Sequence, residues 1–232
     1  MKQDDPRLRI AASRRMLARE GCESMVAGHV SERAAGEDAF WISPFEYFDE
    51  TLPERIVKIG FDLTVLTGSW QPSPAVQFHA AIYGERADVC AIVHTHSQHI
   101  SALVTRDEPV RPYNITAALF AGAQASYVED GLQPPVEGKL VAAALADNDA
   151  LLISNHGVII TGPTLEEATM RAILIEQAAR FQLEARAAGG TVMAADDLPR
   201  RADFYRGRAI KLMWQANLRR FRRTDADLFA AS

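Results

Sequence analysis

Histidines follow two apolar segments of the chain in a pattern that suits metal binding. The apolar run 89–93 leads directly into His94-Thr95-His96. A β-strand sends residues i and i+2 to the same face, so the two imidazoles should point into one space. A third histidine, His156, follows the apolar run 150–153 and precedes a glycine. Three neutral imidazoles that meet at strand ends make a divalent-metal site with coordination positions open for a substrate, which is typical of an enzyme.

A lone His-x-His pair has a simpler explanation, because half-buried strands often carry two polar residues on their solvent face. The segment Asn155-His156-Gly157 favours the metal site instead. Both histidine segments are apolar strands with a polar tip, and open α/β sheets bind ligands at strand ends.

Length and composition indicate one large domain. The chain has 232 residues, of which 48% are hydrophobic, and it contains no Gly/Ser-rich or Pro-rich spacer and no internal repeat. We therefore expect a single domain over residues 1–232, with a core at about 6–190 and a C-terminal helix at about 204–223. The net charge of −5 argues against nucleic acid as a partner, and the basic stretch 219–223 is expected to be the solvated face of a helix.

The first residues lack the apolar core of a signal peptide, and no apolar run is long enough to span a bilayer. We therefore expect a cytoplasmic protein without a membrane partner. The two cysteines cannot form a disulfide framework.

Hydrophobic periodicity and turn residues predict a layered α/β/α domain whose elements do not follow a simple βαβ repeat. Thr164 and Glu167 form a capping-box pattern at the start of a long alanine-rich helix. Helices are predicted at about 6–20, 74–83, 98–104, 113–120, 136–146, 164–189 and 204–223, and strands at about 24–33, 40–43, 56–60, 64–66, 89–94 and 150–153.

Five short segments form a more specific pattern. They are Ala27-Gly28-His29-Val30-Ser31, Trp41-Ile42-Ser43-Pro44, Phe78-His79-Ala80-Ala81-Ile82-Tyr83, Val93-His94-Thr95-His96 and Asn155-His156-Gly157-Val158. Together they resemble the class II aldolase/adducin family, from Ala11 to about Phe221. The resemblance implies a three-layer α/β/α domain around a central mixed, mainly antiparallel sheet. It also implies a homo-oligomer, typically a homotetramer, with the site near a subunit interface.

The same resemblance assigns His94, His96 and His156 as ligands of a divalent metal. Zinc is the metal we expect first, with manganese, iron and cobalt as alternatives, because three histidines do not distinguish among them. Tyr113 matches a tyrosine that reaches into the neighbouring subunit's site in the sugar-phosphate aldolases.

One position departs from the family pattern. Aldolase members carry an acid/base glutamate four residues before the histidine that matches His79, and this chain has Ala75 there. No shift of the alignment restores the carboxylate, because no Asp or Glu lies between Asp62 and Glu85. A methyl group cannot move a proton.

The elements that recognise phosphate in the sugar-phosphate aldolases are also sparse. His29 stands where those members have the asparagine of a Gly-Asn pair, and no Gly-rich loop or Lys/Arg cluster replaces it. We therefore do not expect a sugar phosphate as the substrate. The segment from Gly28 to Ser31 is more similar to family members that decarboxylate hydroxylated aromatic or heteroaromatic acids.

Three neutral imidazoles leave a metal its full +2 charge, which stabilises an enolate formed when a neighbouring bond breaks. Retro-aldol cleavage needs a base to take a hydroxyl proton, whereas loss of carbon dioxide needs only a proton donor to finish. The alanine at position 75 therefore favours decarboxylation. We predict a metal-dependent carbon–carbon lyase that acts on a small chelating hydroxy acid or hydroxy-carbonyl compound.

Other residues receive expected roles. Tyr113 or His29 is the candidate proton donor. His79 is expected to be a structural histidine, and His99 is expected to lie at the surface or behind the ligands. The candidate substrate-binding residues are Gly28, Ser43, Ser73 and Arg111.

Two alternative functions remain open. A three-histidine site also suits iron(II) and dioxygen, and some members of the family are non-haem iron oxygenases. Adducin keeps this domain as an interaction module without aldolase chemistry, and the missing glutamate fits that hypothesis as well.

Overall fold

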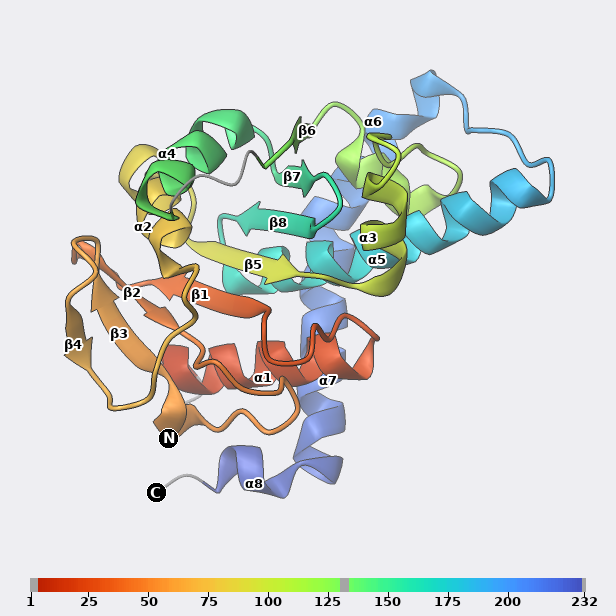
Figure 1. Ribbon diagram of the computed structural model, residues 1–232. Helices are drawn as coiled ribbons and strands as arrows, with labels where there is room; N and C mark the ends of the chain where they lie inside the picture. The colour runs from red at the N-terminus through yellow and green to blue at the C-terminus, as the bar shows by residue number, and fades with distance from the viewer. Residues whose placement is uncertain (1–3, 130–133, 231–232) are drawn as a thin grey trace.

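An eight-stranded sheet forms the centre of the computed structural model, which describes residues 4–129 and 134–230 (Figure 1). The strand order is β4-β3-β2-β1-β5-β8-β7-β6. Only β6 and β7 pair in parallel, and the other neighbours are antiparallel. The prediction of a mixed, mainly antiparallel sheet is therefore confirmed. The strands are β1 (His29–Arg33), β2 (Ala39–Ile42), β3 (Val57–Gly60), β4 (Val65–Thr67), β5 (Ala91–Thr95), β6 (Gln124–Tyr127), β7 (Ala150–Ile153) and β8 (Gly157–Gly162).

Helices cover both faces of the sheet, which confirms the three-layer α/β/α arrangement (Figure 1). One face carries α2 (Val76–Glu85) and α4 (Pro134–Leu145), and the other carries α1 (Pro6–Arg19), α3 (Gln98–Val104), α5 (Leu165–Ala187) and α7 (Ile210–Thr224). The remaining elements are the short helices α6 (Leu198–Phe204) and α8 (Ala226–Phe229), the 3-10 turns Pro53–Arg55, Ile115–Phe120 and Ala195–Asp197, and the π-helical turn Tyr205–Ala209. No helix among residues 4–129 and 134–230 combines the length and the apolar character needed to cross a lipid bilayer.

The alternation of β5 decides which face of the sheet each of its side chains meets. Val93 packs in the core between the sheet and α1 and α5, whereas Ile92 packs in the second core under α2 and α4. Because side chains alternate along a strand, His94 shares the face of Ile92. In the neighbouring strand, His29 is the register partner of His94. The histidines of β1 and β5 therefore lie side by side under α2.

Several predicted elements differ from the structure. The first strand begins at His29 rather than at residue 24, because Met25 has a left-handed backbone (φ 54°) that interrupts extended pairing. The strands β6 and β8 are not predicted above. β6 is half-polar and lies at the edge of the sheet, and β8 follows β7 through a short turn in which Asn155 is left-handed.

Helical segments also differ in detail. The last long helix begins at Ile210, after the π-helical turn 205–209, rather than at residue 204. The segment predicted at 113–120 is a 3-10 turn over Ile115–Phe120. At the start of α5, Thr164 accepts the backbone N–H of Glu167 as expected, and the Glu167 carboxylate pairs with Arg171.

Candidate metal centre

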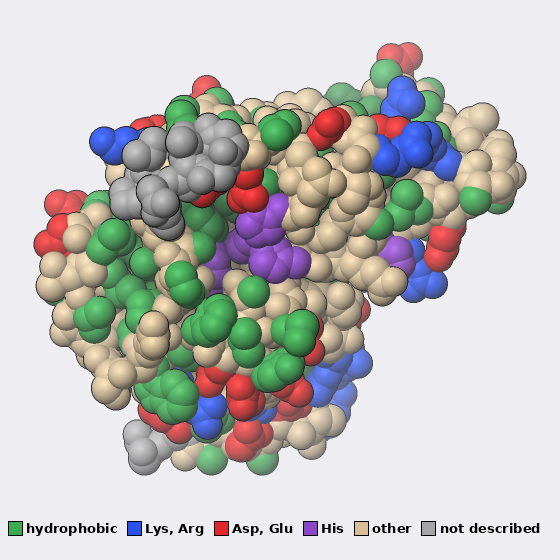
Figure 2. Space-filling view, in the orientation of Figure 1, with side chains coloured by type: hydrophobic (Ala, Val, Ile, Leu, Met, Phe, Trp, Pro, Cys, Tyr) green, Lys and Arg blue, Asp and Glu red, His purple; other side chains and the backbone are tan. Residues whose placement is uncertain are grey.

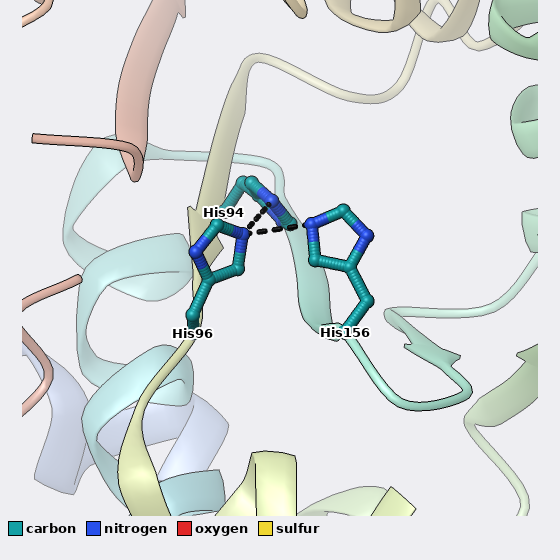
Figure 3. Close-up of side chains that lie close together, drawn as sticks. All are labelled: His94, His96 and His156. Atoms are coloured by element: carbon teal, nitrogen blue, oxygen red, sulfur yellow. Dashed lines mark hydrogen bonds between the residues drawn. The ribbon is translucent and has the colours of Figure 1, made fainter.

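Three histidines converge at the ends of two central strands, where β5 ends and β8 begins (Figure 3). His94 lies in β5, His96 follows that strand directly, and His156 lies in the turn between β7 and β8. The Nε2 atom of His96 lies 2.8 Å from the Nε2 atoms of both His94 and His156. One nitrogen from each ring lies within 4.8 Å of the others, so a single divalent ion can contact all three.

A glycine allows the two segments to approach. A Cβ atom built on Gly157 would lie 2.3 Å from the carbonyl oxygen of Thr95 and 3.0 Å from Cδ2 of His96. No side chain fits in that space. The glycine after His156 is therefore required for close packing of β8 against β5 at the histidine cluster.

Gly157→Ala should weaken metal binding by about 10- to 100-fold, because β8 and the His96 ring must move apart to accept the methyl group. Titration of the metal-free protein with zinc, followed by calorimetry, measures the effect. Gly84→Ala in α2 is the matched control, since a Cβ atom there meets nothing within 4 Å. Equal zinc affinities for the two variants would contradict the packing argument.

Hydrogen bonds orient two of the three rings. The Nδ1 of His94 donates to the carbonyl oxygen of Val158 at 3.0 Å, and Nδ1 of His156 lies 2.7 Å from the Glu129 carboxylate. Each contact holds the proton on Nδ1 and leaves the Nε2 lone pair for a metal. Glu129 has no predicted role above, because it lies 27 residues before His156 and no spacing pattern joins the two.

The surroundings of His94 and His96 keep these two ligands neutral, as metal coordination requires. Burial lowers the pKa of His94 well below its ordinary value, and the neighbouring histidines lower it further. Burial also lowers the pKa of His96 to about 4. A site of neutral imidazoles fits a divalent transition metal.

The metal-free protein should lose stability as the pH falls from 7 to 5. Burial lowers the pKa values of His29, His79, His94 and His96 in the folded state. Below pH 6.5 the unfolded chain therefore binds protons that the folded chain does not. Each histidine that stays neutral removes about 1.4 kcal/mol per pH unit in this range. Urea unfolding at pH 7, 6 and 5 with a chelator measures the slope.

Glu32 provides the matched variant for this measurement. Burial raises its pKa to about 7, so the folded state binds a proton there before the unfolded state does, and this contribution opposes that of the histidines. Glu32→Gln should therefore steepen the loss of stability. A profile that stays flat in both proteins would contradict the prediction.

A pocket of about 310 Å³ lies over the histidine cluster. Figure 2 shows histidine side chains at the bottom of a hollow on this face of the molecule. Apolar side chains form much of its wall. Besides the three clustered histidines, the lining includes His29, Ser73, Pro74, Ala75, Phe78, Glu129, Glu137, Val141, Ile153 and Ile159.

The structure places two of the other predicted site residues, His29 and Ser73, in this pocket. Gly28 lies beside it, where a Cβ atom would come within 2.4 Å of the Phe48 ring and 2.9 Å of the His94 carbonyl oxygen. Ser43 is buried behind it, and its hydroxyl accepts hydrogen bonds from the backbone N–H of Val30 and from an arginine. Gly28 and Ser43 thus shape the backbone next to the pocket.

Tyr113 and Arg111 do not line the pocket in the described part of the chain. The backbone N–H of Arg111 donates to the side chain of Gln182 in α5, and the backbone N–H of Tyr113 donates to the carbonyl oxygen of Arg111.

A carboxylate reaches the pocket from an element that the sequence analysis does not connect with it. Glu137 lies in α4, which packs against α2 so closely that a Cβ atom on Gly138 would lie 3.2 Å from the carbonyl oxygen of Gln77. Ala75 and Glu137 therefore line one cavity although 62 positions separate them in the sequence.

A buried arginine holds the loops next to the pocket. The Arg14 guanidinium is fully buried and donates to the carbonyl oxygens of Gly28 and Pro44 and to the Ser43 hydroxyl, at 3.1, 3.3 and 2.8 Å. It also donates to the carbonyl oxygen of Glu46 and lies 4.2 Å from the centre of the Phe48 ring. Burial lowers the pKa of Arg14 to about 9, so the group stays charged at neutral pH.

Comparison with known proteins gives a consistent result. Residues 8–183 match the family model of the Class II Aldolase and Adducin N-terminal domain. The Meiotically up-regulated gene 14 protein of Schizosaccharomyces pombe is 32% identical over 180 residues, which are 75% of this chain and 70% of that protein. The 5-deoxy-D-ribulose 1-phosphate aldolase of Bacillus thuringiensis is 28% identical over 195 residues, 81% of this chain and 88% of that enzyme.

A decarboxylase and a solved structure are also similar. The 3-oxo-tetronate 4-phosphate decarboxylase of Escherichia coli K12 is 30% identical over 136 residues, which are 56% of this chain and 63% of that enzyme. The crystal structure of an aldolase II superfamily protein from Pseudomonas syringae has a TM-score of 0.87 and 23% identity, and the match covers 98% of this chain and 97% of that one. The structural match shows a shared fold.

Proposed function

Because the chain belongs to the class II aldolase and adducin family, we propose that it is a metal-dependent carbon–carbon lyase. Its substrate would be a small chelating hydroxy acid or hydroxy-carbonyl compound, with decarboxylation favoured over retro-aldol cleavage. The observation that carries the proposal is the convergence of three imidazoles under a small pocket.

His94, His96 and His156 would hold the metal, with zinc expected first and manganese, iron or cobalt as alternatives. The chemistry that the ion supplies when bound is stabilisation of the negative charge that forms on a substrate oxygen as the carbon–carbon bond breaks. The Glu129 carboxylate supports this role because it orients His156.

The rest of the pocket favours loss of carbon dioxide. Ala75 places a methyl group where aldolase members carry the base, and the walls around it are largely apolar. Such walls exclude water from the reacting carbon. After carbon dioxide leaves, the substrate carbon must take up a proton, and His29 and Glu137 line the pocket as groups that can donate a proton or a hydrogen bond.

The similar proteins support the reaction class. One is named as an aldolase and another as a decarboxylase, and both names describe lyases that break a carbon–carbon bond. We also propose a homotetramer in which Tyr113 reaches a neighbouring subunit's pocket. Light scattering of the purified protein tests the assembly.

Elemental analysis of protein purified without a histidine tag is the first test of this function. Near-stoichiometric zinc or manganese, followed by carbon dioxide release from a panel of small hydroxy and oxo acids, is the expected result. Release of an aldehyde without carbon dioxide would replace the decarboxylase with an aldolase. Iron together with substrate-dependent oxygen consumption would indicate an oxygenase, and failure to bind metal after reconstitution would leave an adducin-like interaction domain.

A further inference from the structure

Four buried polar side chains form a continuous chain from the pocket into the layer under α2. His29 and Ser31 come from β1, and His79 and Tyr83 come from α2. The His29 Nδ1 lies 2.6 Å from Nε2 of His79, Nδ1 of His79 lies 2.7 Å from the Ser31 hydroxyl, and that hydroxyl lies 2.7 Å from the Tyr83 hydroxyl. None of the four side chains is more than 1% exposed.

The four side chains of this hydrogen-bonded series are all neutral. The four side chains are at most 1% exposed, and no carboxylate takes part in the hydrogen bonds that join them, so no hydrogen-bonded counter-charge compensates a charge on any of them. Each imidazole therefore carries one N–H and one lone pair. The hydrogen bonds must then all run in one of two directions along the chain.

The Tyr83 end of the hydrogen-bonded series decides in which direction the hydrogen bonds run. Within the part of the molecule that the structure describes, Ser31 is the one hydrogen-bond partner of the Tyr83 hydroxyl. If Ser31 donated to Tyr83, the phenol proton would be buried without an acceptor at the end that does not line the pocket, whereas a proton at the His29 end can meet an acceptor in the pocket. Tyr83 therefore donates to Ser31, Ser31 donates to Nδ1 of His79, and Nε2–H of His79 donates to Nδ1 of His29. The proton of His29 is consequently on Nε2.

The Nε2 of His29 lies at the inner end of the pocket. His29 lines the pocket and His79 does not, and among residues 4–129 and 134–230 the buried Nε2 atom of His29 has no hydrogen-bond partner. The ring centre of His29 lies 4.9 Å from that of its register partner His94. A buried donor without a partner, next to three ligating imidazoles, is suited to an acceptor atom of a bound molecule.

We propose that His79, Ser31 and Tyr83 hold His29 as a fixed N–H donor, and that His29 donates to an anionic oxygen of a carboxylate substrate bound at the three-histidine centre. This inference rests on the proposed function for the identity of the substrate class. It gives the lyase a preference for substrates with a carboxylate oxygen at the inner end of the pocket.

The same chain defines what His29 does in catalysis. A neutral histidine that gave its Nε2 proton to a carbon atom would become an anionic imidazolate unless His79 returned a proton to its Nδ1 in the same step, and that relay runs through Ser31 to Tyr83. The buried phenol resists ionisation because burial raises its pKa. His29 therefore stabilises developing negative charge through a hydrogen bond, and proton delivery is left to Glu137 or to Tyr113 of a neighbouring subunit.

Binding of oxalate to the zinc-loaded protein tests the donor role without any turnover. Calorimetry should show oxalate binding to the wild type and a loss of affinity of at least about tenfold in His29→Leu, with unchanged zinc content. His29→Asn keeps an N–H donor and should recover part of the affinity. Tyr83→Phe should weaken oxalate by about three- to tenfold, whereas Tyr205→Phe, a buried tyrosine outside the pocket, should not change it.

Nitrogen NMR of the metal-free protein tests the direction of the chain separately. The His29 ring should show the Nε2–H tautomer in the wild type and lose it in part in Tyr83→Phe. An Nδ1–H tautomer in the wild type, no oxalate binding by the zinc-loaded wild type, or equal oxalate affinities for wild type and His29→Leu would each overturn the inference. If these results hold but no lyase activity is found, the proposed function fails and the donor role of His29 survives.

Discussion

Replacement of His96 by alanine should reduce the metal content of the purified protein from near one ion per chain to near zero. The Nε2 atom of His96 lies 2.8 Å from the Nε2 atoms of both His94 and His156. Its loss therefore leaves only two imidazoles to hold the ion. Loss of a supporting residue behind a ligand already weakens metal binding by about 10- to 100-fold, and loss of a ligand should exceed that. Lyase activity should fall in parallel.

His99→Gln is the matched control for this measurement. His99 pairs with Glu176 and does not line the pocket, and that carboxylate also accepts the backbone N–H groups of His99 and Ile100. The control should keep its metal and its activity. Unchanged metal content in His96→Ala, measured by elemental analysis, would remove the site altogether.

Arg14→Ala should lower the free energy of unfolding by about 3–5 kcal/mol, because the change leaves several buried carbonyl groups without a donor and opens a cavity. The affected acceptors belong to Gly28, Pro44 and Glu46. Urea unfolding followed by circular dichroism measures the loss. Since Gly28 directly precedes His29, the variant should also bind zinc more weakly at temperatures where it is still folded.

Arg19→Ala tests whether any arginine of α1 would have this effect. Arg19 pairs at the surface with Asp225, and such a pair contributes about 1 kcal/mol or less. Similar losses of stability in the two variants would show that burial of the Arg14 guanidinium is not what matters.

Local patterns predict the layered fold and bring the ligands together. The apolar runs before His94 and His156 mark the strands β5 and β7, and the i, i+2 spacing of His94 and His96 places their side chains on one face. The family match confirms the resemblance drawn from five short segments. The single domain over 1–232 and the roles of the site residues stay predictions.

Contacts between distant elements are what the sequence does not reveal. Glu129 and Glu137 enter the pocket because α4 and the end of β6 dock beside α2 and β7, and no spacing rule connects those segments with residue 75. From the sequence, Arg14 is expected on the solvent-exposed face of an amphipathic helix, whereas in the structure it is fully buried. The strand β8 begins directly after His156, because the left-handed Asn155 turns the chain back at once, and hydrophobic periodicity does not show that the chain re-enters the sheet there.

The edge position of β6 links metal binding to local unfolding. Edge strands open more easily than central ones, and β6 ends two residues before Glu129, whose carboxylate holds His156. Opening of the edge would release that carboxylate, so the open state must bind metal less tightly than the closed state. By mass action, a metal ion bound at the central strands then shifts the equilibrium toward the closed state of the edge strand β6. The amide hydrogens of β6, which do not contact the metal ligands, should therefore exchange with solvent more slowly when metal is bound at the three histidines.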